Sequence, residues 1–148
     1  MTQEQKNKID FEKIIGNTRQ VKILYELLKK REHNISHQNI PTLSEHKQFV
    51  INHPYRVWYL ILVDEQYVGS VYLLKSNCLG LALLRNEEFL LNAIFNFIFK
   101  RHKPLKEIKS LRAPYFHINI APTNKVMMSG LENIGAKKIQ TTYSLDFN

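Results

Sequence analysis

The chain has 148 residues, 44% of them hydrophobic, and a formal net charge of +8. This length and apolar content suit one compact domain, so we expect residues 1–148 to form a single domain, with 1–17 as a loose N-terminal segment. Its one cysteine, Cys78, excludes an intramolecular disulfide. The most apolar run, residues 89–99, falls short of the roughly 20 residues that cross a bilayer, and no leader pattern begins the chain, so we expect a cytoplasmic protein without a membrane segment.

In chain order, residues 1–17 are polar and weakly patterned, and leave open a short strand, a helical turn or a loose tail. From Thr18, read as an N-cap, apolar side chains recur at helical spacing and predict a first helix. Residues 32–41 lack periodicity and read as a loop. Thr42 and Glu45 have capping-box spacing, which predicts a second helix that ends before Pro54.

Three strands are expected next. Residues 55–63 are almost all β-branched, aromatic or aliphatic, as a central strand buried on both faces requires. Short turns lead from there to residues 67–74 and then to residues 78–84, which makes two successive antiparallel hairpins. Gly69 and Gly80 weaken strand propensity, so each indicates a bulge or a place where another group approaches the backbone.

The third strand runs directly into a helix that we expect from Asn86 to near His102. The first N–H groups of such a helix point at the end of the strand, where they can hold an anion, so a phosphate-bearing ligand would bind there. A strand at 115–120, a helix that ends at Gly135 and a last strand or pair of strands at 136–147 complete the chain.

The positive charge is densest in residues 100–112, with six basic residues against one acid. This stretch has no aromatic residue to stack on a base, and the chain has no recognised nucleic-acid-binding motif. We interpret it as a solvated basic connection rather than a nucleic-acid surface, with attraction for an anionic small ligand as a third reading. The six histidines and Cys78 do not have the spacing of a metal site.

Three stretches resemble the GNAT acyltransferases: residues 68–72 with 79–83, residues 118–124, and residues 131–136. They resemble the middle strands, the fifth strand with the start of the fourth helix, and the end of that helix. Residues 34–59 resemble a subgroup that modifies amino-sugars for surface glycans. The resemblance implies an α+β fold whose mixed sheet has antiparallel front strands and then a splayed parallel pair, flanked by helices. It also implies acyl transfer from acetyl-CoA or another acyl-CoA to an amine.

The same resemblance implies where the acyl-CoA would bind. Backbone of the fourth strand would pair with its pantetheine arm, the following helix start would hold its pyrophosphate, and two asparagines would contact the arm. These cofactor-binding candidates are Leu81, Leu83, Arg85, Asn86, Asn119 and Asn124.

Three features depart from the family pattern. No glycine lies between Gly80 and Gly130, Glu87 and Glu88 occupy the first helical turn where they repel a pyrophosphate, and Leu131 stands where family members carry a proton-donating tyrosine. Other residues would then supply the acid–base chemistry. The candidates are His37 as general base and Tyr72 as proton donor.

Two functions follow from these observations. The first, which we favour, is an N-acyltransferase acting on a small amine such as an amino-sugar nucleotide. The second is a GNAT-shaped binding or assembly module without catalysis. The sequence leaves a homodimer open.

Overall fold

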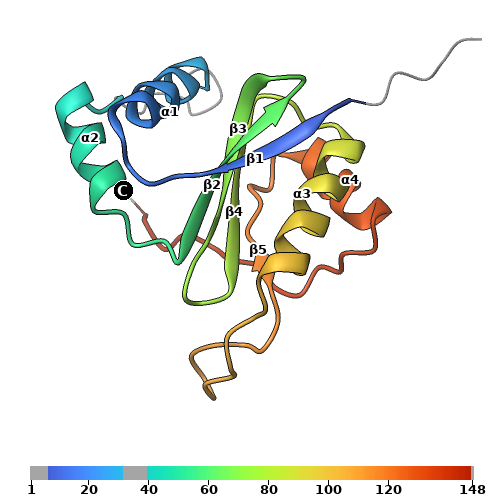
Figure 1. Ribbon diagram of the computed structural model, residues 1–148. Coiled ribbons are helices and arrows are strands. Elements are labelled where there is room, and N and C mark those ends of the chain that lie inside the picture. Colours follow the sequence, from blue (N-terminus) through green and yellow to red (C-terminus); the bar gives the residue numbers. More distant parts are fainter. Residues whose placement is uncertain (1–6, 32–39, 148) are drawn as a thin grey trace, which may run out of the picture.

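The computed structural model describes residues 7–31 and 40–147. One five-stranded sheet, in the order β1-β2-β3-β4-β5, is flanked by helices on both faces (Figure 1). Neighbouring strands are antiparallel from β1 to β4, and β4 and β5 are parallel, which confirms the expected α+β fold with its mixed sheet. The elements are β1 (Ile9–Lys13), α1 (Thr18–Lys30), α2 (Leu43–Ile51), β2 (Val57–Val63), β3 (Gln66–Leu73), β4 (Cys78–Leu83), α3 (Glu88–Arg101), β5 (His117–Ile118) and α4 (Lys125–Asn133).

The N-terminal part of the chain forms a strand, one of the three alternatives that the sequence left open. β1 pairs with β2, from Ile9 opposite Val63 to Lys13 opposite Tyr59. The Glu12 carboxylate accepts hydrogen bonds from Arg19 at 2.8 Å, from the Gln20 amide at 2.9 Å and from the Tyr67 hydroxyl at 2.9 Å. These bonds connect β1 to α1 and β3.

Capping side chains determine where the first two helices begin. The Thr42–Glu45 capping box is present, with both reciprocal bonds formed, and α2 begins at Leu43. The N-cap of α1 is Asn17 rather than Thr18, because the Asn17 side chain accepts the bond from the Gln20 amide at 2.8 Å. Both residue types cap helices well, so the sequence alone did not separate them.

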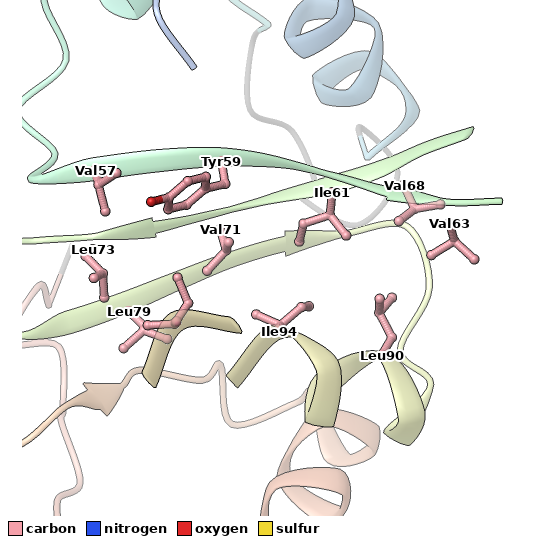
Figure 2. Packing of buried hydrophobic residues seen from close by; sticks show 11 residues of the cluster. Val57, Tyr59, Ile61, Val63, Val68, Val71, Leu73, Leu79, Leu90 and Ile94 are labelled. Atoms are coloured by element: carbon pink, nitrogen blue, oxygen red, sulfur yellow. The ribbon is translucent and has the colours of Figure 1, made fainter. Parts of the chain in front are cut away.

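Two apolar layers cover the central strand β2. On one face, β2, β3 and β4 pack against α3, and Figure 2 shows Ile61, Val71 and Ile94 meeting between sheet and helix. On the other face, Trp58 and Leu60 pack against side chains of α1 and α2. Leu60 and Ile61 are both fully buried, which confirms a strand buried on both faces.

The sheet register explains Gly69. The pairing of β2 with β3 shifts between Ile61 and Leu62, so Val68 is an extra residue and forms a bulge. A Cβ atom at Gly69 would lie only 2.1 Å from the Ala82 carbonyl oxygen, so a side chain cannot fit there. The expected bulge is therefore confirmed.

The basic connection is fastened to the sheet by Asn77, which is fully buried in the turn between β3 and β4. Its side-chain amide donates to the carbonyls of Leu105 at 3.0 Å and Ala113 at 2.8 Å, and its carbonyl accepts from the Leu105 amide at 2.7 Å. Asn77 has a φ of 71°, a left-handed conformation that asparagine tolerates better than most residues. One buried side chain thus fixes the path of a long polar loop.

The C-terminal part of the chain differs from expectation. β5 has only two residues instead of the six expected at 115–120. Residues 136–147 form no strand, and all are exposed, so that prediction is wrong for the chain as the structure describes it. A strand needs a hydrogen-bonding neighbour, and pattern alone does not supply one. None of the described helices has the length and apolar character needed to span a bilayer.

Candidate functional site

One unpaired stretch of sheet edge belongs to β4, past the residues that pair with β5. The parallel pairing covers only Cys78 and Leu79 of β4. Cys78 accepts a bond from Leu74, and Leu84 donates to Val68, so the even-numbered residues of β4 direct their peptide groups toward β3. Because peptide groups alternate sides along a strand, those of Leu81 and Leu83 face the open edge. In the described part of the chain, no strand pairs with β4 there.

The start of α3 lies at the end of this edge. Its N-cap residue, Glu87, makes no side-chain hydrogen bond to the first turn. The Glu87 carboxylate is instead paired with the Arg85 guanidinium, and Glu88 is exposed. Asn86 is also exposed and precedes the N-cap. The Leu90 N–H donates to the Glu87 carbonyl at 3.1 Å, so the N–H groups of Glu88 and Phe89, which no side chain caps, are the ones available to an anion.

Tyr72 lies across Gly80. The two residues are opposite each other in the β3–β4 pairing, and a Cβ atom at Gly80 would lie 1.8 Å from Tyr72 Cζ. The tyrosine ring therefore occupies the space that any other residue at position 80 would fill. Since the hydroxyl is attached to Cζ, it projects over β4 beside the open edge at Leu81. The sequence expectation of a close approach at Gly80 is confirmed.

A second tyrosine supports this ring. Tyr55 stacks on Tyr72, with ring centroids 4.0 Å apart and planes 6° apart. Burial raises the pKa of Tyr55 to about 12, and the neighbouring Tyr72 hydroxyl adds to the shift. Tyr55 therefore keeps its proton across the physiological range. Tyr55 is also in edge-to-face contact with Phe49 and Trp58, and the His53 ring lies tilted against it.

On the same face of the sheet, two buried polar atoms have no hydrogen-bond partner among the described residues: His46 Nε2 and Trp58 Nε1. The two side chains are each 6% exposed. Burial lowers the pKa of His46, against a backbone hydrogen bond at Val21 that raises it, and burial also lowers the pKa of His53, which favours the neutral imidazole in both. His46 packs against the Tyr25 ring at 5.2 Å, as expected of a packing residue.

The asparagine candidates occupy different places. Asn119 is exposed, and its amide lies 3.6 Å from Cys78 Sγ. Burial raises the pKa of the Cys78 thiol, which disfavours the reactive thiolate. Asn124 caps α4, where its carbonyl accepts from the Met127 amide at 3.2 Å. That bond uses only the oxygen of the Asn124 side chain.

Leu131, at the position where the family resemblance implies a tyrosine, is a core residue of α4. It is 7% exposed and packs with Leu91 and Met127 between α3 and α4. His37 lies outside the described residues. The structure thus brings Tyr72, Leu81 and Leu83 to one edge, next to Arg85 and Asn86. Sequence reasoning missed Tyr55, whose position at the start of an apolar run gave no separate signal. The described residues contain no cluster of metal-binding side chains.

No family model matches the chain, and no curated protein matches it. Several solved structures match it. The aminoglycoside N-acetyltransferase AAC(6')-Iy in complex with CoA superposes with a TM-score of 0.58, at 10% identity and over 97% of each chain. A possible acetyltransferase from Clostridium difficile 630 superposes with a TM-score of 0.55, at 11% identity, over 95% of this chain and 98% of that one.

A third solved structure is the aminoglycoside acetyltransferase meta-AAC0020 from an uncultured soil metagenomic sample, in complex with sisomicin. It gives a TM-score of 0.54 at 12% identity, over 93% of this chain and 97% of that one. All three likenesses extend over nearly the full length of both chains. Together with the mixed sheet and its short parallel pair, they show that this chain has the GNAT fold of these acetyltransferases.

Proposed function

We propose that this protein is an N-acyltransferase that transfers an acyl group from acetyl-CoA or another acyl-CoA to a small amine. The observation that carries this proposal is the open edge of β4, where no described strand pairs with the peptide groups of Leu81 and Leu83. This edge lies beside a first turn of α3 that has no side-chain cap. Backbone donors of this kind fit the amides of a pantetheine arm and the oxygens of a diphosphate. The solved complex of AAC(6')-Iy with CoA supports the choice of ligand.

Each group of residues at the β4 edge would bind one part of the acyl-CoA. Leu81 and Leu83 hold the arm through their backbone, and the N–H groups after Asn86 face the diphosphate. Arg85 neutralises Glu87, which reduces the repulsion that this carboxylate would exert on phosphate. Asn119 and Asn124 contribute amide groups from the β5 side. When bound, the thioester supplies an activated acyl group, and the chain positions the amine that attacks it.

Tyr72 is the proposed proton donor, because its hydroxyl projects over β4 where the thioester carbon would lie beside Leu81. The stacked Tyr55 ring holds the Tyr72 ring in that orientation. His37, which follows α1 in the sequence, is the proposed general base for the amine. A positioned acid or base contributes about 10²–10⁴-fold to the rate.

The net charge of the protein favours one class of acceptor molecule. At a net charge of +8, the chain attracts an anionic acceptor and repels a polycation such as an aminoglycoside. We therefore propose an amino-sugar nucleotide, whose diphosphate matches the charge of the protein, in the cytoplasm where acyl-CoA is made. The resemblance of residues 34–59 to enzymes of surface amino-sugar modification supports the same class.

Calorimetric titration of acetyl-CoA tests the binding edge. The Leu81 N–H faces away from β3, so Leu81→Pro removes a donor to the ligand without removing a bond of the sheet. Leu81→Ala is the matched control, since it loses the same packing but keeps the N–H. We expect Leu81→Pro to weaken binding about tenfold more than Leu81→Ala, the equivalent of one hydrogen bond. Equal affinities of the two variants would contradict the contact at the Leu81 N–H, and no heat from the parent protein at millimolar ligand would favour the non-catalytic module.

Turnover tests the chemistry. Release of free CoA thiol is measured with an amino-sugar nucleotide and with an aminoglycoside as acceptors. We expect Tyr72→Phe and His37→Ala to lower kcat by about 10²–10⁴-fold without changing the affinity for acetyl-CoA. Activity of Tyr72→Phe equal to that of the parent would exclude this tyrosine as the acid.

A further inference from the structure

The basic connection, residues 100–112, contains a tight turn that carries an exposed leucine. Ile108 and Arg112 exchange two backbone hydrogen bonds, of 2.9 Å and 2.8 Å, and the Leu111 N–H donates to the Ile108 carbonyl at 2.9 Å. Leu111 is 81% exposed and Ile108 is 44% exposed. The turn therefore presents two aliphatic side chains to solvent, and we call residues 108–111 the apolar tip.

Side-chain hydrogen bonds hold the apolar tip in place. The Arg112 guanidinium donates from Nε to the Lys106 carbonyl at 2.7 Å and from Nη1 to the Lys75 carbonyl at 3.1 Å. Asn77 fastens both ends of the same loop, as described above. Figure 1 shows the loop, in orange, projecting from the sheet past the turn between β3 and β4. The exposed leucine is thus part of a built structure that extends away from the body of the molecule.

Lysines surround the apolar tip. Lys103, Lys106 and Lys109 are exposed, and so is Lys75 in the turn between β3 and β4. None of these four lysines forms an ion pair with another of the described residues. Glu107 is the one acid between residues 100 and 112. The projecting loop therefore combines an apolar end with uncompensated positive charge.

We propose that the apolar tip and the lysines around it dock on an anionic phospholipid surface. The ammonium groups attract the phosphate headgroups, while Leu111 and Ile108 enter the boundary between headgroups and acyl chains. Either a basic patch or a small apolar anchor by itself gives weak attachment, and the two together give a stable one. The loop has both, so it fits a lipid surface as a peripheral contact.

The composition of the loop favours lipid over a macromolecular partner. Protein interfaces are enriched in aromatic residues and arginine and depleted in lysine, and they bury about 1,200 Å² or more. Two aliphatic side chains supply far less than this area, and a bilayer requires no fitted surface. Proteins bind single-stranded nucleic acid through aromatic rings that stack on the bases, and the apolar tip has no such ring.

Docking through this loop leaves the proposed acyl-CoA edge free. The loop follows the C-terminal end of α3, whereas the proposed diphosphate site is at the start of α3. A helix of 14 residues, from Glu88 to Arg101, is about 20 Å long, so the two sites lie at opposite ends of it. The inference does not depend on acyl transfer, since no residue of the proposed acyl-CoA edge takes part.

Flotation with lipid vesicles tests the proposal on the full chain. We expect the protein to float with phosphatidylcholine vesicles that contain about one third phosphatidylglycerol, and not with vesicles of phosphatidylcholine alone. Binding should weaken as the salt concentration rises, because salt screens the lysine charges. No flotation with the anionic vesicles, or equal flotation with both kinds, would overturn the proposal.

One pair of variants tests the apolar tip. Leu111→Ser keeps every charge and should lower the partition onto anionic vesicles about tenfold. The matched control, Ile15→Ser, removes an apolar side chain that is 76% exposed between β1 and α1, and should leave the partition unchanged. Equal partition of the two variants would contradict insertion of Leu111.

A second pair of variants tests the lysines. Lys106→Gln with Lys109→Gln should lower the partition about 25-fold, at about fivefold for each charge near the surface. The matched control, Lys22→Gln with Lys30→Gln, removes the same net charge from α1 and should change the partition less than about twofold, because these charges lie beyond a Debye length from the lipid. An equal loss in both double variants would show that net charge alone drives binding and would overturn the placement.

A dye at the apolar tip reports insertion directly. Cys78, the one cysteine of the chain, is 8% exposed, so a thiol-reactive, polarity-sensitive dye labels the variant Ser110→Cys at the turn. The emission should shift to shorter wavelength on anionic vesicles, whereas the same dye on Lys22→Cys should not shift. Equal shifts at the two positions would contradict entry of this tip into the lipid.

A fluorescent single-stranded oligonucleotide tests the other interpretation of the charge. We expect it to compete weakly with the anionic vesicles. If the parent protein prefers the oligonucleotide, and Leu111→Ser binds oligonucleotide and vesicles as the parent does, the loop is a nucleic-acid surface and the lipid proposal is wrong.

Discussion

Gly80→Ala is the sharpest perturbation of the candidate site, because it adds one methyl group where Tyr72 lies. The new Cβ would be 1.8 Å from Tyr72 Cζ and 2.3 Å from two further ring carbons. No real Cβ contact is that short, so the ring must turn away. Tyr72 then loses its stacking on Tyr55, and its hydroxyl leaves the space over β4.

The size of the effect follows from three contributions. Overpacking costs about 1–3 kcal/mol. Loss of an aromatic pair costs about 0.5–1.5 kcal/mol. Against these, alanine gains about 0.5–1 kcal/mol over glycine in a strand. We therefore expect Gly80→Ala to lower the free energy of unfolding by about 2 kcal/mol.

A double-mutant cycle isolates the cause. In a Tyr72→Ala background the ring is absent, so Gly80→Ala should be neutral or stabilising by about 0.5 kcal/mol. Urea unfolding can be followed through the fluorescence of Trp58, the one tryptophan of the chain, which is 6% exposed. If Gly80→Ala costs the same free energy in both backgrounds, the ring of Tyr72 is not what requires glycine at position 80, and its orientation over β4 is refuted.

Three further predictions concern stability. Asn77→Ala should cost about 3 kcal/mol, since it removes three hydrogen bonds of a fully buried side chain and places alanine at a positive φ. The exposed Ser76→Ala should change the unfolding free energy by less than about 0.5 kcal/mol. Burial and neighbouring basic side chains hold the pKa of His102 below its ordinary 6.5. The stability that its neutral form contributes is therefore complete above pH 6.5, and it is lost as the pH falls because the unfolded state takes up the proton first. His102→Gln should reduce the change of the urea midpoint between pH 7 and 5. Burial acts to raise the pKa of Glu12, but bonds from Gln20, Arg19 and Tyr67 hold it below 4.5, so Glu12→Gln should reduce the loss of stability below about pH 4.5. A slope unchanged by either substitution would contradict the corresponding assignment.

Much of the fold follows from local chemistry that the sequence displays. The capping box of α2, the central apolar strand and the left-handed Gly135 after α4 each act within a few residues. Gly69 and Gly80 signalled close contacts because a missing side chain in a strand has few other uses. The sequence did not identify which atoms make those contacts, since the Ala82 carbonyl and the Tyr72 ring come from neighbouring strands.

The failures share a different cause. Residues 143–147 alternate apolar and polar side chains, but a strand also needs a neighbour, and the pattern does not say whether the same chain provides one. The sequence predicts Tyr55 as the beginning of a strand, within the stretch that resembles the amino-sugar-modifying subgroup, and does not predict it as a site residue. Tyr72 lies opposite Trp58 in the β2–β3 pairing, and Tyr55, just before β2, stacks on it. This contact depends on the register of the two strands rather than on spacing in the sequence.

The start of α3 shows how geometry changes a judgement based on charge. In the sequence, Glu87 and Glu88 at a phosphate site are two repulsive charges, and Arg85 offsets part of them. In the structure, Glu87 is paired with Arg85 and its side chain does not cap the helix, so its carboxylate is neutralised while the N–H groups of Glu88 and Phe89 stay open. Had Glu87 capped the helix, the same composition would have closed the anion site. The direction of one side chain therefore decides whether this edge can receive a diphosphate, and here it leaves Glu88 as the one uncompensated acid of the turn.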